Sequence, residues 1–332
     1  MTKMDDLKSI YKYNHVLGII KKSTRILIVT HEKPDGDALA SMCSLSLLLD
    51  KLGCSYTLFC SDPISPSFSF LPNIDKVISD RDRVAGKEFH KFDLIIATDC
   101  GSISRTKLEE EIKNKQEHQF FIEIDHHPRK EKKMSNLEVR IPQAAASTEV
   151  IYYFLKHNGI KVNKDMADCI LTGILTDTAN FFHPSATKET ISIASMMINR
   201  GAQFTKITKA IWQNKNLKAM KSWSLVLNNL RINQKYNIAF TVLTQKEMEE
   251  FQDNEEVMET ITNSLNNLQG VRAVIFLRQE KKGVIRGNIR TNNPDIDVSK
   301  LANILGGGGH PKAAGFSIPG KIKKTKYSWT II

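Results

Sequence analysis

A histidine and two carboxylates lie within seven residues near the start of the chain, at His31, Asp35 and Asp37. They directly follow the apolar run 25–30, which predicts a short buried strand. The loop that leaves the carboxyl end of such a strand is where α/β proteins usually place their chemistry. The cluster alone is a weak signal, because Asp37 would also serve as the N-cap of a helix beginning at residue 38.

Acidic and histidine side chains also follow three later segments of the chain. In a parallel sheet the carboxyl ends of the strands meet at one edge, so we expect these side chains to converge with the first cluster. Four or five carboxylates cannot share a small volume unless cations neutralise their charge. The joint pattern therefore predicts a site for two divalent metal ions. The later residues are Asp99 after 93–98, Asp125, His126 and His127 after 119–124, and Asp177 after 171–176.

The types of these side chains narrow the choice of metal. Carboxylates and imidazoles without a thiolate suit Mn²⁺ best, and Mg²⁺, Co²⁺ and Fe²⁺ are the alternatives. Two such ions about 3.5–4 Å apart clamp both the attacking and the leaving oxygen of an in-line phosphoryl displacement. The chemistry predicted from these residues is hydrolysis of a phosphate ester.

The elements that must position these side chains form a regular alternation. Strands that alternate with helices are typical of a doubly wound, mostly parallel sheet. Gly53 should end the first of the helices. The predicted strands cover 25–30, 55–60, 93–98 and 119–124, and the predicted helices cover 38–51, 148–158 and 164–175.

The pattern changes after residue 184. Helical sequence over 188–199 and 204–229 is followed by strand patterns over 238–242, 273–278 and 284–290. We therefore predict an α/β protein in three parts. These parts are a catalytic domain over 1–190, a helical connector over 191–217 and a smaller mixed α/β domain over 218–332.

Composition sets the class of protein. The 332 residues are 41% hydrophobic and 25% charged, which is typical of a globular protein with room for two cores. The sequence has no long uncharged apolar stretch and no signal-peptide layout, so we expect a cytoplasmic protein without membrane contact. Five cysteines without a CxxC pair argue against a disulfide framework. The net charge of +11 suits a polyanionic substrate, although a lysine-rich proteome would produce the same excess.

These motifs resemble those of the DHH phosphoesterase family. The matching stretches are 31–38, Asp99, 125–128 and 173–178, and the run 306–316 (GGGGHPKAAGF) resembles the signature of the family's DHH-associated C-terminal domain. The resemblance extends to the stand-alone nanoRNase branch of bacterial oligoribonucleases, which also dephosphorylate 3′-phosphoadenosine 5′-phosphate. RecJ-type exonucleases share the motifs but are typically longer.

The resemblance implies roles for the residues of the first domain. Asp125 would orient the histidines from behind the metals, and His127 would face the substrate, contacting its phosphate or assisting the leaving oxygen. Arg105, in a stretch that matches the family only loosely, would lie near the phosphates. Asp99 would bridge the two metals. The implied ligands are His31, Asp35 and Asp99 for one cation, and Asp37, Asp99, His126 and Asp177 for the other.

The C-terminal domain would bind the substrate. Consecutive glycines expose backbone N–H groups and allow positive φ, so the run at Gly307, Gly308 and Gly309 predicts an anion-binding nest, with a plain tight turn as the alternative. His310 beside it would add a hydrogen bond or a charge. Arg290 matches a basic position of the family and would contact a terminal phosphate.

We therefore expect a metal-dependent phosphoesterase that hydrolyses very short 5′-phosphorylated oligoribonucleotides, dinucleotides preferred, to nucleoside monophosphates. Hydrolysis of 3′-phosphoadenosine 5′-phosphate to AMP is implied as a second activity. Two alternatives stay open: a signalling phosphodiesterase for linear or cyclic dinucleotides, and a catalytically idle nucleotide-binding module. The intact ligand set argues against the idle module. The expected partners are short single-stranded RNA and small phosphonucleotides, and a homodimer is expected only by analogy with the family.

Overall fold

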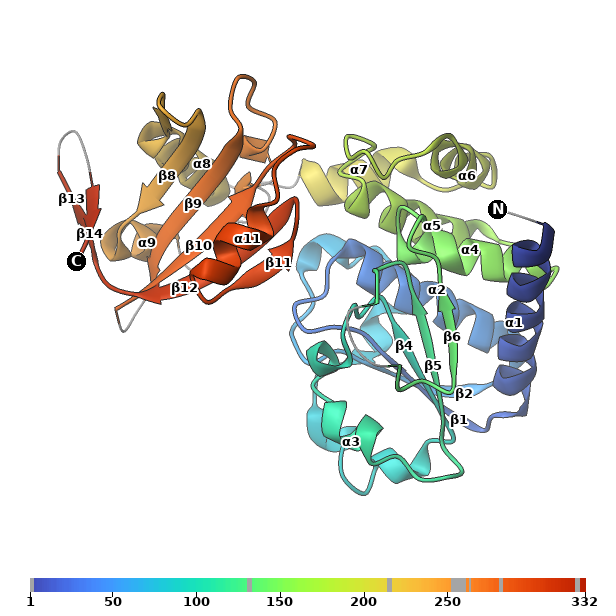
Figure 1. The fold of residues 1–332 in the computed structure, drawn as a ribbon. Coiled ribbons are helices and arrows are strands. Elements are labelled where there is room, and N and C mark those ends of the chain that lie inside the picture. The colour runs from blue at the N-terminus through green and yellow to red at the C-terminus, as the bar shows by residue number, and fades with distance from the viewer. Residues whose placement is uncertain are drawn as a thin grey trace. The chain divides into compact units, whose positions relative to one another are not determined.

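The computed structural model describes residues 3–129, 133–213, 217–251, 261–262, 264–280, 283–325 and 329–332. The chain divides into two compact units, Met1–Asn214 and Lys215–Ile332, and each is described by itself (Figure 1). The limits of the catalytic domain, connector and C-terminal domain given above remain predictions.

The first unit is built on a six-stranded sheet in the order β3-β2-β1-β4-β5-β6. Every neighbouring pair in it is parallel, which confirms the predicted α/β fold with a parallel sheet. The order reverses between β1 and β4, and this switch point is where ligands bind in open α/β sheets. The strands are β1 (Arg25–Val29), β2 (Ser55–Phe59), β3 (Val77–Ile78), β4 (Leu94–Thr98), β5 (Phe120–Asp125) and β6 (Leu137–Arg140).

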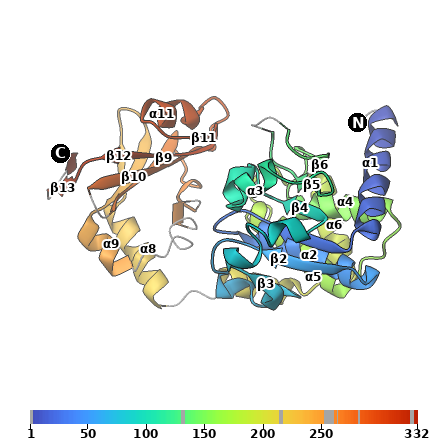
Figure 2. The same cartoon turned by 90° about the horizontal axis from the view of Figure 1, so that it is seen from below.

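Successive residues of a strand point to opposite faces, and β1 shows this plainly. Ile26 and Ile28 join the core beneath the long helices, whereas Leu27 and Val29 join a second core. Irregular segments, short 3₁₀ turns and α3 cover that second core (Figures 1 and 2). The helices are α1 (Lys3–Lys22), α2 (Gly36–Leu52), α3 (Glu109–Lys113), α4 (Ser147–His157), α5 (Lys164–Asp177), α6 (Lys188–Asn199) and α7 (Phe204–Trp212).

Helix α2 carries two of the predicted ligands at its N-terminal end, one just before its first turn and one inside it. Its N-cap is Asp35, whose side chain accepts a hydrogen bond from the N–H of Ala38 at 3.0 Å. The alternative reading of Asp37 as the cap is therefore wrong, because α2 begins at Gly36 and Asp37 already lies inside it. Gly53 ends α2 in the left-handed conformation, with φ of 69°, as predicted.

The second unit contains another six-stranded sheet, in the order β11-β12-β10-β9-β8-β7. Only β8 and β9 are parallel among its described pairs. The helix predicted over 204–229 is two helices, α7 and α8, and residues 214–216 lie outside the described part. The elements are α8 (Leu217–Asn229), β7 (Arg231–Asn233), β8 (Ile238–Leu243), α9 (Gln245–Phe251), β9 (Ala273–Glu280), β10 (Val284–Arg290), α11 (Val298–Ile304), β11 (Gly308–His310), β12 (Ala313–Pro319), β13 (Ile322–Lys324) and β14 (Trp329–Ile331).

None of the described helices is both long enough and apolar enough to cross a membrane. All five cysteines are free thiols.

Candidate metal centre

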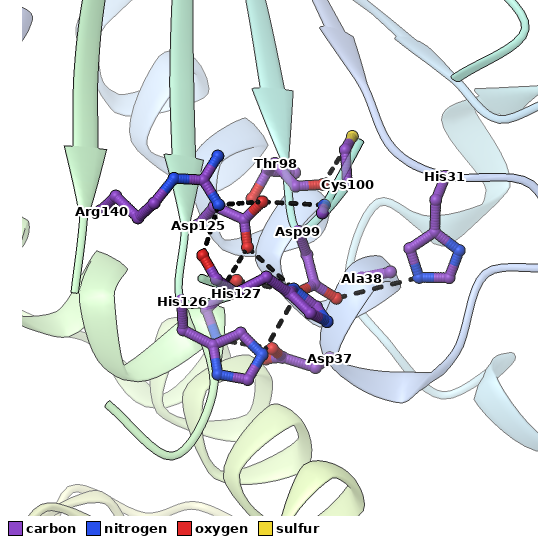
Figure 3. Close-up of polar contacts among 12 residues, drawn as sticks. His31, Asp37, Ala38, Thr98, Asp99, Cys100, Asp125, His126, His127 and Arg140 are labelled. Atoms are coloured by element: carbon purple, nitrogen blue, oxygen red, sulfur yellow. Dashed lines mark hydrogen bonds and ion pairs between the residues drawn. The ribbon is translucent and has the colours of Figure 1, made fainter. Parts of the chain in front are cut away.

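The predicted ligands gather at the switch point of the first sheet (Figure 3). His31 comes from the loop after β1, Asp99 directly follows β4, and His126 directly follows β5. Asp177 differs, because it is the last residue of α5 and its position depends on helix packing rather than on a strand end.

Three overlapping groups of side chains could each hold a cation. In every group, one ligand atom per residue lies within 4.8 Å of the others. One group is the full ligand set that the family resemblance implies for one cation. A second group contains the set implied for the other cation except Asp99, and a third adds His127 as an alternative ligand. The groups are His31, Asp35 and Asp99; Asp37, His126 and Asp177; and Asp99, His126 and His127.

Asp99 lies between the first two groups. Its Oδ2 is 3.9 Å from Nε2 of His31, and its Oδ1 is 3.7 Å from Nε2 of His126 (Figure 3). The two oxygens of one carboxylate therefore face the two groups, which is the arrangement that a bridging ligand requires. Asp99 holds this position in the left-handed region, with φ of 56°. A non-glycine residue there costs about 1 kcal/mol or more, and such strain is common at functional sites.

The carboxylates of this centre repel one another. Burial, followed by the charges of Asp37 and Asp35, raises the pKa of Asp99 well above its ordinary value. Burial and the same two neighbours also raise the pKa of Asp177 well above its ordinary value. The negative charge is therefore concentrated here without enough compensation from the described residues, and divalent cations would supply that compensation.

The surroundings of His126 also indicate that a cation belongs at this centre. Nδ1 of His126 lies 3.2 Å from the carbonyl oxygen of Ala144, so Nδ1 carries the proton and donates it. In the neutral tautomer that this bond selects, Nε2 of His126 carries the lone pair, and this atom is buried without a hydrogen-bond partner among the described residues. Its nearest charged neighbours are acceptors as well: Asp177 at 3.4 Å and Asp99 at 3.7 Å. A lone pair that faces carboxylates fits a bound metal ion.

The first turn of α4 supports the ligands, and sequence reasoning missed it. The carboxylate of Asp37 accepts hydrogen bonds from the N–H groups of Ser147 at 2.5 Å and Thr148 at 3.0 Å. The hydroxyl of Ser147 donates to Oδ1 of Asp99 at 2.9 Å. The positive end of the α4 dipole thus faces Asp37. In the sequence, Ser147 and Thr148 indicate only the start of a helix.

Asp125 holds His127 rather than both histidines. Its Oδ1 accepts hydrogen bonds from the backbone N–H and from Nδ1 of His127, each at 2.9 Å. Its Oδ2 accepts from the N–H of Gly101 at 2.9 Å and pairs with Arg140 at 3.2 Å. Burial alone would raise the pKa of Asp125, but the bonds from His127 and the charge of Arg140 outweigh it and hold the pKa well below its ordinary range.

Arg105 lies at the edge of the centre, on the 3₁₀ turn η5 (Ile103–Thr106). Its Nη2 is 3.0 Å from Nδ1 of His31, and its Nη1 donates to the carbonyl oxygen of Cys100 at 3.2 Å. Gly101 lies beside both Arg105 and His127, since a Cβ at position 101 would stand 3.6 Å from each side chain. The structure thus brings Arg105 and His127 to the same side of the candidate centre.

The predicted substrate residues of the second unit also gather. Arg290 pairs with Ala313 across β10 and β12, and Ala313 pairs with His310 across β12 and β11. Directly opposed residues share a face of a sheet, and neighbouring strands are about 4.8 Å apart. Arg290 and His310 therefore lie on one face, with a small alanine between them.

Close packing gives the glycine run a second reason beside the predicted anion-binding nest, which stays a prediction. A Cβ at Gly307 would overlap the carbonyl oxygen of Gly315, and one at Gly309 would lie 2.5 Å from the carbonyl oxygen of Ala313. Close packing against β12 therefore requires glycine at these positions. The N–H of Gly307 donates to Ala302 at 2.8 Å and so is not available to an anion, which narrows the predicted nest to Gly308 and Gly309.

An acid-rich, histidine-containing centre at the switch point of a parallel sheet is typical of a metal-dependent hydrolase of phosphate esters. Comparison with protein families gives the same class. The DHH family, N-terminal domain, matches residues 25–174, and the DHHA1 domain matches residues 235–328. The chain belongs to the DHH family of phosphoesterases, and the resemblance seen in its motifs is confirmed.

Individual proteins resemble the chain over most of its length. A bifunctional oligoribonuclease and PAP phosphatase NrnA of Bacillus subtilis is 27% identical over 307 residues, which cover 92% of this chain and 90% of the relative. A probable protein of the same name from Streptococcus mutans is 28% identical over 91% of this chain and 92% of its own length. The crystal structure of an exopolyphosphatase-related protein from Bacteroides fragilis has the same fold, with a TM-score of 0.85, 23% identity and coverage of 92% and 90%.

Proposed function

We propose that the chain is a two-metal phosphoesterase that hydrolyses very short 5′-phosphorylated oligoribonucleotides, dinucleotides first, to nucleoside monophosphates. We further propose that it converts 3′-phosphoadenosine 5′-phosphate to AMP. The observation that carries the reaction type is Asp99, whose two oxygens face two separate groups of ligand atoms. The substrate class is supported by the names of the relatives from Bacillus subtilis and Streptococcus mutans.

The cations that we propose are two Mn²⁺ ions, because oxygen and imidazole ligands without thiolate suit this metal. When bound, they would lower the pKa of the attacking water and stabilise charge on the phosphoryl oxygens. The ligands would be His31, Asp35 and Asp99 on one side and Asp37, His126 and Asp177 on the other, with Asp99 shared.

The remaining residues would handle the substrate and its proton. Asp125 fixes the ring of His127 through Nδ1, so Nε2 is the nitrogen left to hold a proton for the leaving oxygen. The His127 side chain is 28% exposed, whereas that of His31 is 3% exposed, which suits His127 for contact with a substrate. Arg105 would contact a phosphate of the substrate from the edge of the centre.

Arg290, Gly308, Gly309 and His310 would hold the part of the substrate away from the reacting phosphate. The shared face of Arg290 and His310 supports this assignment. A guanidinium recognises a terminal phosphate by two parallel hydrogen bonds, which would explain a preference for 5′-phosphorylated substrates.

A length series tests the proposal. Purified protein with Mn²⁺ would be given 5′-phosphorylated RNAs from a dinucleotide to a long oligonucleotide, beside 3′-phosphoadenosine 5′-phosphate and cyclic di-AMP. We expect turnover to be fastest for the dinucleotide and to decline with length. A clear preference for cyclic di-AMP would point to a signalling phosphodiesterase instead, and no turnover by folded, metal-loaded protein would leave a nucleotide-binding module.

We also propose that the protein works in the cytoplasm, which its five free thiols support. A homodimer stays a prediction, and light scattering on the purified protein would test it.

A further inference from the structure

A buried glutamate stands behind the candidate metal centre without belonging to any ligand group. Glu149 in the first turn of α4 is 3% exposed. Its Oε2 accepts hydrogen bonds from the N–H of Ala145 at 3.1 Å and the hydroxyl of Thr190 at 2.9 Å, and its Oε1 accepts from Tyr153 at 3.2 Å. Burying a carboxylate among neutral donors costs free energy. Glu149 is therefore expected to have a role besides packing.

One peptide bond connects Glu149 to His126. The carbonyl of Ala144 accepts the proton of His126 Nδ1 at 3.2 Å. The N–H of Ala145, at the other end of the same amide, donates to Glu149 at 3.1 Å. A carboxylate on the N–H of an amide polarises it, and the carbonyl becomes a stronger acceptor. Glu149 therefore influences both the orientation of the Ala144–Ala145 peptide plane and the strength of the hydrogen bond that its carbonyl accepts from Nδ1 of His126.

The same turn of α4 is also tied to α6. Thr190 lies in the first turn of α6, where it shares a capping box with Thr187, and its hydroxyl donates to Glu149. This contact joins residues 41 positions apart in the chain. The first turn of α4, which carries the donors to Asp37 and Asp99, is thus anchored by Glu149 to a second helix.

We propose that Glu149 is a positioning residue for His126. Acting through the Ala144–Ala145 peptide, it holds the proton on Nδ1 and presents Nε2 to the cation of the Asp37, His126 and Asp177 group. The inference rests on the metal centre of the proposed function. It adds that this cation depends on Glu149 more than the cation of the His31, Asp35 and Asp99 group does, because none of the described hydrogen bonds of Glu149 reaches a member of that group directly.

The test compares three full-length variants freed of metal with a chelator and titrated with Mn²⁺ by calorimetry. Glu149→Leu keeps the volume but removes the acceptor, Glu149→Gln keeps an acceptor without the charge, and Tyr153→Phe removes only the bond to the other oxygen. We expect Glu149→Leu to weaken one of the two binding steps at least about tenfold, the lower end for loss of an outer partner of a ligand. Glu149→Gln should recover part of that loss, and Tyr153→Phe should leave both steps as in the wild type.

A second measurement does not involve metal. Nitrogen NMR of the histidine rings in the metal-free protein should show His126 protonated on Nδ1, and a mixture of tautomers in Glu149→Leu. Wild-type affinities at both steps and an unchanged tautomer in that variant would reduce Glu149 to a core residue and overturn the inference. If Glu149→Leu does not fold in a thermal melt, Thr190→Val should weaken the same binding step to a smaller extent, and no change there would equally overturn it.

The two proposals can fail separately. Protein that binds two Mn²⁺ ions but turns over none of the substrates would overturn the proposed function and leave the role of Glu149 standing. Active protein in which the Glu149 variants change neither Mn²⁺ binding step would overturn the role of Glu149 and leave the proposed function standing.

Discussion

Gly173 in α5 and Asp37 in α2 are in such close contact that position 173 has no room for a side chain. A Cβ there would overlap Oδ1 of Asp37 and the hydroxyl of Thr148. Gly173 has no positive φ. Packing where α2, α4 and α5 meet therefore requires this glycine, and the same packing sets the distance between Asp37 and Asp177.

Gly173→Ala should damage both the fold and the metal centre. Overpacking at this buried point is expected to lower the free energy of unfolding by about 1–3 kcal/mol. The displaced Asp37 should also weaken Mn²⁺ binding in calorimetry. Gly18→Ala is the matched control, because Gly18 lies inside α1 with nothing within 4 Å of its ideal Cβ. It should leave Mn²⁺ binding unchanged and stabilise the protein by up to about 1 kcal/mol.

Asp99→Asn should impair metal binding and activity without lowering the stability of the metal-free protein. Asparagine keeps the shape and still accepts the hydrogen bond from Ser147, but it removes one charge from a crowded set of carboxylates. The metal-free variant should therefore melt at the wild-type temperature or above it, while the rise in melting temperature on adding Mn²⁺ should disappear. Activity should fall at least about a hundredfold. Retained activity would exclude Asp99 as the bridging ligand.

His127→Asn decides between two roles for His127. If His127 serves the leaving oxygen, kcat should fall by about 10²–10⁴-fold, which is typical of losing a general acid, and both Mn²⁺ binding steps should remain. If the group of Asp99, His126 and His127 holds a cation, one of the binding steps should be lost. We expect the first result, because Asp125 already occupies Nδ1 of His127.

Arg290→Ala should raise KM far more for substrates with a 5′-phosphate than for the same substrates without it. The reason is that a guanidinium matches a terminal phosphate, whereas a hydroxyl offers no charge. Arg286→Ala is the control, since Arg286 lies on the same strand, four residues earlier, and forms an ion pair with Glu280 at 3.7 Å. A similar rise in KM for both kinds of substrate would place Arg290 away from the 5′-phosphate.

Glu247 should make the stability of the second unit depend on pH. Burial alone would raise its pKa, but hydrogen bonds from Lys324, Thr244 and Asn229 outweigh it and lower the pKa from 4.5 to about 2. A carboxylate with a lowered pKa stabilises the folded state above its ordinary pKa and loses this contribution as the pH falls. Glu247→Gln should therefore cost about 1–2 kcal/mol at pH 7, allowing for partial exposure, and this difference should shrink as the pH falls from 5 towards 2. Denaturant titrations across that range would measure it, and a constant difference would contradict the assignment.

The sequence by itself determined the part of the site that follows from short-range pattern. An apolar run followed by an acid or a histidine locates the end of a strand, and parallel strands place all such ends at one edge. His31, Asp99 and His126 could be brought together by this argument alone, before any contact was known.

Short-range pattern also explains which elements were missed. The edge strand β3 has two residues and β6 has four, too few to show a period, so Arg140 at the end of β6 could not be connected with Asp125. In the second unit, the glycine run suggested an anion-binding nest or a tight turn, and its strand pairing with β12 was missed because that pairing depends on residues outside the run.

Only the tertiary structure decided how the ligands are held. The hydrogen bonds from Ser147 to Asp37 and to Asp99 join positions 110 and 48 residues apart, and the role of Gly173 depends on three helices at once. Hydrogen bonds and close packing act over a few ångströms in space, whatever the separation along the chain. A sequence pattern therefore shows which residues can bind a metal, but the packing of α2, α4 and α5 decides how each of them is oriented.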